Sequence, residues 1–240
     1  MTNDIESCLT KEEIEKKRTP KELELWVEKI LEFTKNDKNK KPALLHRGLF
    51  KPFYEEVRPL SLFVNKIYPS SSDIRCIPSI DNKDFDAIIR DYTISPPHEL
   101  KVEFTYAIDG HREHLRMKYF REHGEVNLLE SVSYTGNKRT GHSIEVPDEM
   151  VDHNDSLQKT FSLIKAATEN KSKIRNPKRY GKKTHVLVVV FDDRTWFNAC
   201  NKVELEEFIK KEVLILDLNF KTVYILGEER ETFLSFELSV

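Results

Sequence analysis

The stretch DFDAIIRDYTISPPHELKVEFT, residues 84–105, decides the fold of this chain. Apolar and polar residues alternate in its second half and just beyond it. The apolar positions are Leu100, Val102, Phe104, Tyr106 and Ile108, and the polar positions between them are Lys101, Glu103 and Thr105. This period of two predicts a strand with one buried face. The first half alternates in the same way, and Pro96-Pro97 between the halves suits a loop. We therefore expect a β-hairpin.

The polar face of this hairpin carries two acidic side chains. Asp86 lies on the first strand and Glu103 on the second, and pairing of the strands brings them together on the face opposite the core. Lys101 and Thr105 flank Glu103 on the same face. Carboxylates held on rigid strands are suitable ligands for a hard divalent cation, Mg²⁺ or Mn²⁺.

Length and composition exclude several classes of protein. The chain has 240 residues, a net charge of −2 and only 7 glycines, and it contains neither GxGxxG nor GxxxxGK[ST]. No stretch is long and apolar enough to predict a membrane span, and no signal-peptide core begins the chain. The three cysteines are scattered, which indicates a reducing compartment. We expect a cytoplasmic protein that has no association with membranes.

The elements around the hairpin predict an α/β domain. Capping signals and apolar periodicity favour helices over 19–34, 52–67, 111–123, 156–170 and 203–213, and strands over 74–80, 184–191, 221–226 and 232–238. The apolar run at 184–191 predicts a central strand covered on both faces. A further hairpin is predicted at 125–146. We expect a mixed central sheet flanked by helices with this hairpin inserted, in one domain over 19–240 preceded by a peripheral arm over 1–18.

Three clusters of basic residues are candidates for contact with phosphate groups. Arg112 and Arg116 lie one helical turn apart, and Lys138 and Arg139 lie at the tip of the predicted 125–146 hairpin. The third cluster, the predicted loop 171–183, has seven basic residues and no acidic one. Its candidates for nucleic-acid binding are Lys178, Arg179, Lys182 and Lys183. A solvated run of lysines would show the same pattern.

The order of elements and the hairpin carboxylates resemble the PD-(D/E)XK, restriction-endonuclease-like superfamily. Asp86 matches that family's Asp, and Lys101–Thr105 (KVEFT) match its second motif, with Glu103 as the second metal ligand. The resemblance spans residues 45–226 and implies a restriction-endonuclease-like fold and bound magnesium. It also implies an acidic residue on the preceding helix. Glu55 and Glu56 are the candidates, and Glu56 lies beside the apolar stripe; a favourable helix dipole would also explain both.

The position of the family's assisting lysine holds Thr105 in this chain. Some relatives carry this lysine on a neighbouring element. Lys101 on the same strand face, and Lys159 or Lys165 on the predicted 156–170 helix, are therefore expected to supply the ammonium.

The resemblance implies a Mg²⁺-dependent endonuclease or exonuclease that hydrolyses phosphodiester bonds, with DNA as the expected substrate. Two alternatives stay open. A binding or protein-interaction module with a decayed site would explain Thr105, and an RNA-cleaving toxin or defence effector would use the same chemistry. A homodimer and a partner protein are both compatible with the sequence.

Overall fold

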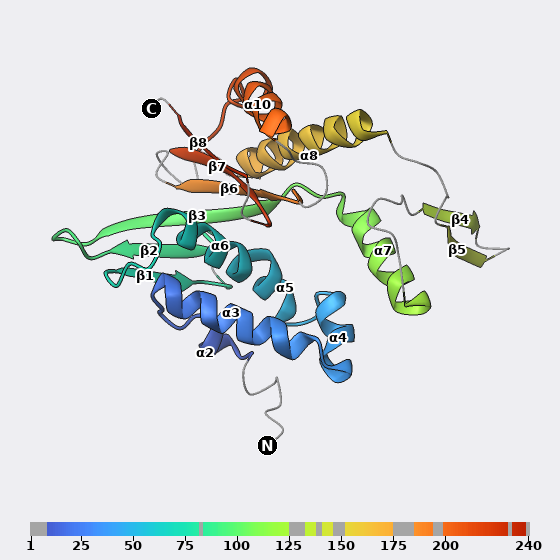
Figure 1. Ribbon diagram of the computed structural model, residues 1–240, viewed down its shortest axis with the longest axis horizontal. Helices are drawn as coiled ribbons and strands as arrows, with labels where there is room; N and C mark the ends of the chain where they lie inside the picture. Colours follow the sequence, from blue (N-terminus) through green and yellow to red (C-terminus); the bar gives the residue numbers. More distant parts are fainter. Residues whose placement is uncertain are drawn as a thin grey trace.

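The computed structural model describes residues 9–81, 84–124, 133–137, 141–145, 152–174, 185–193, 199–229 and 232–238. Its centre is a six-stranded mixed open sheet flanked by helices (Figure 1). In spatial order the strands are β1 (Ile74–Pro78), β2 (Ala87–Asp91), β3 (His98–Tyr106), β6 (Val186–Phe191), β7 (Thr222–Gly227) and β8 (Phe233–Glu237). The expected α/β architecture with a mixed sheet is confirmed.

The sheet combines antiparallel edges with a parallel centre. Strand β3 pairs parallel to β6, and β6 pairs parallel to β7, whereas β1–β2, β2–β3 and β7–β8 are antiparallel. The buried strand β6 lies between β3 and β7, as its continuous apolar run predicts. The hairpin predicted from residues 84–105 is therefore the β2–β3 pair, and its second strand borders the buried centre of the sheet.

Helices from the N-terminal part of the chain cover one face of the sheet. They are α2 (Lys11–Ile14), α3 (Pro20–Thr34), α4 (Asp37–Leu44), α5 (Phe50–Pro52), the π-helix η1 (Phe53–Val57) and α6 (Arg58–Ile67). Helix α3 begins with the predicted capping box, in which the Thr19 side chain accepts from the Glu22 N–H and the Glu22 side chain accepts from the Thr19 N–H. The backbone of Arg18 forms an isolated antiparallel β-bridge with Cys76 at the outer edge of β1. Ile14 is buried. The domain boundary at residue 18 stays a prediction.

Helices from the C-terminal part cover the other face. They are α8 (His153–Ile174), α10 (Ala199–Phe208) and the π-helix η2 (Ile209–Val213). Helix α7 (Gly110–His123) follows β3 and ends at Gly124, whose φ of 83° suits glycine. The predicted second hairpin is the two-stranded sheet of β4 (Ser133–Asn137) and β5 (Gly141–Glu145), which lies apart from the main sheet (Figure 1). In the described parts of the chain, no helix is long and apolar enough to cross a bilayer.

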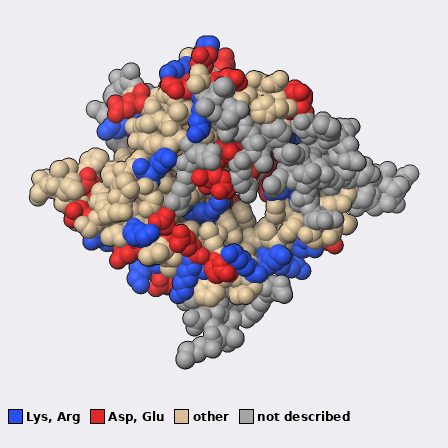
Figure 2. Space-filling model, in the orientation of Figure 1, with Lys and Arg blue, Asp and Glu red and all other residues tan. Residues whose placement is uncertain are grey.

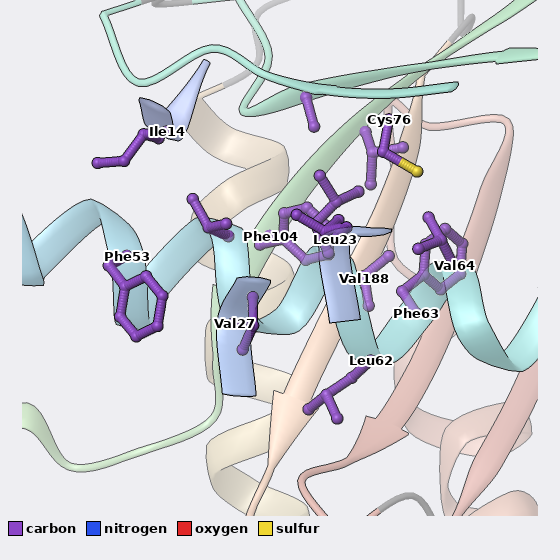
Figure 3. Packing of buried hydrophobic residues seen from close by; sticks show 14 of the residues in the cluster. Ile14, Leu23, Val27, Phe53, Leu62, Phe63, Val64, Cys76, Phe104 and Val188 are labelled. Carbon is purple, nitrogen blue, oxygen red and sulfur yellow. The ribbon is translucent and has the colours of Figure 1, made fainter. Parts of the chain in front are cut away.

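The core is divided into two clusters by the sheet. Val188 of β6 faces helices α3 and α6, whereas its neighbours Leu187 and Val189 face α8 and η2. Figure 3 shows part of the first cluster, where Phe63 of α6 and Phe104 of β3 lie in the packed layer beside Leu23 and Val188. The Phe63 and Phe104 rings meet edge to face with centroids 6.4 Å apart. Alternation along each strand thus decides which helical layer a residue contacts.

Three predicted elements differ from those observed. Helix α8 continues to Ile174, so the first four residues of the predicted 171–183 loop are helical. Strand β3 ends at Tyr106, which leaves Ile108 beyond it and 45% exposed. Helix α7 buries Leu115 as expected, but Tyr119 and Phe120 are only partly buried because the helix extends away from the sheet (Figure 1).

Asp193, two residues after β6, stabilises a distant turn. Its buried carboxylate accepts hydrogen bonds from the N–H groups of Glu229 (3.1 Å) and Thr232 (3.0 Å). A Cβ added to Gly227 would overlap this carboxylate. The end of a central strand often carries a functional group in α/β folds. Asp193 is instead structural, because a buried carboxylate needs donors and the turn supplies them.

We predict that Asp193→Ala and Gly227→Ala each destabilise the protein by about 2–3 kcal/mol, since each removes or displaces a buried charge-assisted hydrogen bond. Urea unfolding measures the loss. Gly110→Ala is the control, because an added Cβ there meets nothing within 4 Å. An unfolding free energy for Gly227→Ala equal to that of Gly110→Ala would contradict the assignment.

Candidate functional site

The register of β2 against β3 places Asp86 opposite Glu103. Ala87 pairs with Val102, and one residue earlier the Asp86 N–H donates to the Val102 carbonyl at 2.9 Å. The Asp86 carboxylate in turn accepts from the Phe104 N–H at 2.7 Å, so both its backbone and its side chain are fixed to β3. The expected convergence of these two carboxylates on one face is observed.

Glu103 is unusually buried for a carboxylate. The whole residue is 9% exposed. It lies next to the most buried part of the sheet and faces helix α8. An ionised carboxylate in such a position requires a positive partner or strong hydrogen-bond donors. The structure provides a positive partner from α8.

This partner is Lys171, in the last turn of α8. Its ammonium lies 3.6 Å from the Glu103 carboxylate and 3.8 Å from that of Asp86. All three side chains are largely shielded from solvent, with exposures of 26% for Lys171, 18% for Asp86 and 11% for Glu103. The two carboxylates and one ammonium therefore form a compact charged cluster at the interface between β3 and α8.

The lysines predicted from the sequence lie elsewhere. The Lys101 ammonium lies over the Phe85 ring at 5.2 Å, and Lys165 forms an ion pair with Glu212 at 2.8 Å. Lys159 has a lowered pKa because burial disfavours its charge and Arg112 repels it. Sequence reasoning missed Lys171 because it assigned this residue to a loop.

Thr105, at the position where the resemblance implies a lysine, lies beside this cluster. It lines a surface pocket together with Lys171. The observed arrangement thus combines a threonine on β3 with a lysine from α8 at the same place.

Glu56 approaches the cluster from the opposite helical layer, on the π-helix η1. Pro59 has no N–H to continue the α-helical pattern, and the Arg58 N–H bonds to the Phe53 carbonyl five residues earlier. The helical turn at η1 is therefore wider than a turn of an α-helix. The Tyr106 hydroxyl donates to the Tyr54 carbonyl at 3.0 Å and ties η1 to the end of β3.

The Glu56 carboxyl is largely withdrawn from water. Its Oε2 is buried and has no hydrogen-bond partner among the described residues. Burial raises the pKa of Glu56 to about 8, with a further increase from the negative charges of Asp86 and Glu55 that Lys171 partly opposes. Glu56 is therefore mostly protonated at neutral pH in the metal-free protein.

The predicted phosphate-binding residues are only partly described. Arg116 forms a two-pronged ion pair with Glu113 at 2.7 and 2.8 Å, and Arg112 pairs with Asp109 at 3.4 Å. Six other candidates, Lys138, Arg139, Lys178, Arg179, Lys182 and Lys183, lie outside the described residues. Figure 2 shows acidic and basic side chains mixed over the described part of one face. The two arginines are thus already paired within α7 and its N-cap.

The donors fit a small oxygen-liganded cation better than a metal that needs a complete protein cage. No group of three His, Cys, Asp or Glu side chains suited to a metal occurs among the described residues. Magnesium is commonly held by one or two carboxylates, with water and substrate phosphate completing its shell. Asp86 and Glu103 can supply such a pair, and the unpartnered oxygen of Glu56 is a further acceptor nearby.

We predict that Glu56 makes the stability of the metal-free protein depend on pH. The pKa of Glu56 is about 8 in the folded protein and about 4.5 in the unfolded chain. The favourable contribution of its protonated form to the free energy of unfolding is therefore complete below pH 4.5 and is lost as pH rises through 8. Glu56→Gln mimics the protonated form. Relative to the parent, it should gain about 1–2 kcal/mol between pH 5 and pH 8, an amount reduced for partial exposure.

Urea unfolding with a chelator present measures this difference. Glu55→Gln, one residue earlier at a more exposed position, controls for loss of a carboxylate from the same helix. Parallel stability curves for the parent and Glu56→Gln from pH 5 to pH 8 would refute the prediction.

No protein-family model, curated protein or solved structure matches the chain. Its function is therefore inferred from the chemistry and geometry of its own residues.

Proposed function

We propose that this protein is a divalent-metal-dependent nuclease of the PD-(D/E)XK type. The observation that carries the proposal is the Lys171 ammonium, 3.6 and 3.8 Å from two carboxylates that the β2–β3 register sets side by side. Two acidic groups from a strand pair and one lysine from the helix packed against it are the functional groups that the chemistry requires. Lys171, supplied from α8, takes the role for which the strand offers only Thr105.

The fold supports the same proposal. The carboxylates lie on an antiparallel strand pair that continues into the parallel centre of the sheet, and helices cover both faces. An acidic residue, Glu56, comes from the helical segment before the hairpin and lies close enough for the charges of Asp86 and Lys171 to affect its pKa. These features support the proposal of a restriction-endonuclease-like core with β4–β5 as an added hairpin.

Each residue would have a distinct role in phosphodiester hydrolysis. Asp86 and Glu103 would hold Mg²⁺ or Mn²⁺, which when bound neutralises phosphate charge and acidifies a water molecule. Lys171 would donate hydrogen bonds to the attacking water or to a phosphate oxygen and stabilise the negative charge that develops there. Water adds to phosphorus, the phosphorus–oxygen bond to the leaving group breaks, and that oxygen takes up a proton. Glu56 would add a third acidic group on the side opposite α8.

DNA is the proposed substrate. The decayed-site alternative loses its main argument, because Lys171 supplies the ammonium that Thr105 cannot. A binding module would still differ from a nuclease in a measurable way, since it would bind nucleic acid without cleaving it. Parallel assays on RNA distinguish the third alternative.

We predict that Asp86→Asn and Glu103→Gln each reduce Mg²⁺-dependent DNA cleavage by about 100-fold or more, because each removes a ligand charge. Calorimetric titration with Mn²⁺ should show a matching loss of binding heat. Glu99→Gln is the matched control. Glu99 shares the face of β3 with Glu103 but pairs with Arg90 at 2.6 Å. Full cleavage by both site variants would rule out this metal site.

Replacement of Lys171 should separate metal binding from catalysis. We predict that Lys171→Ala lowers kcat for cleavage by about 100-fold, since an ammonium that stabilises developing charge is lost. Mn²⁺ binding should be retained or strengthened, because a positive charge beside the two ligands is removed. Lys165→Ala, on the same helix but paired with Glu212, should leave both properties unchanged. Parental kcat in Lys171→Ala would contradict the assignment of this lysine.

A further inference from the structure

A surface pocket of about 240 Å³ lies between the end of β3 and helix α8. Lys171 and Thr105 form the end that adjoins the carboxylates, and Ile108 and Leu163 line it farther from them. The pocket therefore begins at the candidate site and continues along α8, which packs against β3.

Helical spacing explains why a pocket forms here. Leu163, Ala167 and Lys171 are separated by four residues each and share one side of α8, with Ala166 and Asn170 beside them. The two alanines are too small to fill the space between the helix and the residues that follow β3. Ala166 is exposed and is not part of either core cluster, so the pocket is a feature of the surface.

The lining combines three kinds of chemistry. Lys171 supplies an ammonium, Asn170 beside it offers an amide with both donors and an acceptor, and Ile108, Leu163 and the two alanines provide aliphatic walls. Ile108 is a large apolar side chain that is 45% exposed at this wall. An anionic phosphate joined to a flat ring with a polar edge matches this combination, which is the chemistry of a nucleotide.

We propose that this pocket holds the base of an unpaired nucleotide next to the bond that is cleaved, so that the protein acts on single-stranded DNA. This inference rests on the proposed nuclease function. A base within the pocket is removed from its neighbours in a duplex stack, which costs more free energy in paired DNA than in a single strand. Contact with the ammonium orders the phosphate, and the aliphatic walls exclude water from the base.

Two phenylalanine substitutions on α8 test the proposal. Ala166→Phe fills the pocket from an exposed position, and Ser162→Phe places the same side chain one turn earlier, where it does not line the pocket. Three quantities are measured for each protein. They are binding of a fluorescent six-nucleotide single strand with Ca²⁺ in place of Mn²⁺, Mn²⁺-dependent cleavage of single-stranded and duplex DNA of the same sequence, and hydrolysis of methyl p-nitrophenyl phosphate.

We expect the parent to cleave the single strand at least tenfold faster than the duplex. Ala166→Phe should weaken single-strand binding and cleavage at least tenfold while hydrolysis of the base-free diester stays within twofold of the parent. Ser162→Phe should match the parent in all three assays. Thermal unfolding of both variants checks that the fold is retained.

Parental binding and cleavage by Ala166→Phe, or equal cleavage of duplex and single strand by the parent, overturns the inference. Absence of single-strand binding by the parent does so as well. Failure of the nuclease proposal gives a different result. The parent would then hydrolyse neither DNA nor the small diester, while Ala166→Phe would still weaken binding of the single strand and so support the pocket assignment.

Discussion

The register between β2 and β3 sets which side chains pack under α3 and α6 and which face α8, where the site forms. Asp86 and Glu103 share a face because Ala87 pairs with Val102, and the Phe104 N–H holds the Asp86 carboxylate in that place. A slip of one residue would turn the carboxylates of one strand into the apolar layer under α3 and α6. The packing of Val102 and Phe104 in the first core cluster opposes such a slip. Core packing and site geometry therefore depend on the same alternation.

The sheet could be predicted from the sequence because its signals are local. Alternation at 100–106 and the continuous apolar run of β6 each lie within one element, and they correctly indicated two strands, the second of them central. The expectation that β3 has only one buried face was wrong, because Glu103 on its polar face is buried under α8. Lys171 was missed because the charge pattern at this helix end was followed in place of the helical periodicity. The basic residues after position 170 suggested a solvated loop, although Ile164, Thr168 and Lys171 continue the helical spacing of α8 and no proline occurs before Pro177. Periodicity was the better guide than charge at this helix end.

Other parts of the site depend on contacts between distant segments, which local patterns do not contain. The choice of Glu56 over Glu55 followed from its place beside the apolar stripe, and the buried oxygen of Glu56 agrees with it. The π-helix that carries Glu56 could not be predicted, because a proline also permits a kink or a new helix start. Asp193 follows β6, at a strand end where α/β folds often carry functional groups. Its structural role depends on a turn more than thirty residues later.

The charges of the site can be balanced against its proposed substrate. In the metal-free protein, Asp86 and Glu103 contribute two negative charges and Lys171 one positive charge, while Glu56 is held mostly neutral by burial. Together these four side chains carry one excess negative charge, which would weaken the attraction for a phosphodiester. A divalent cation reverses the sign and leaves one positive charge on the same group, equal and opposite to that of the diester. Protonation of Glu56 therefore matters for the proposed function, because a third ionised acid would cancel the positive charge that one metal ion supplies.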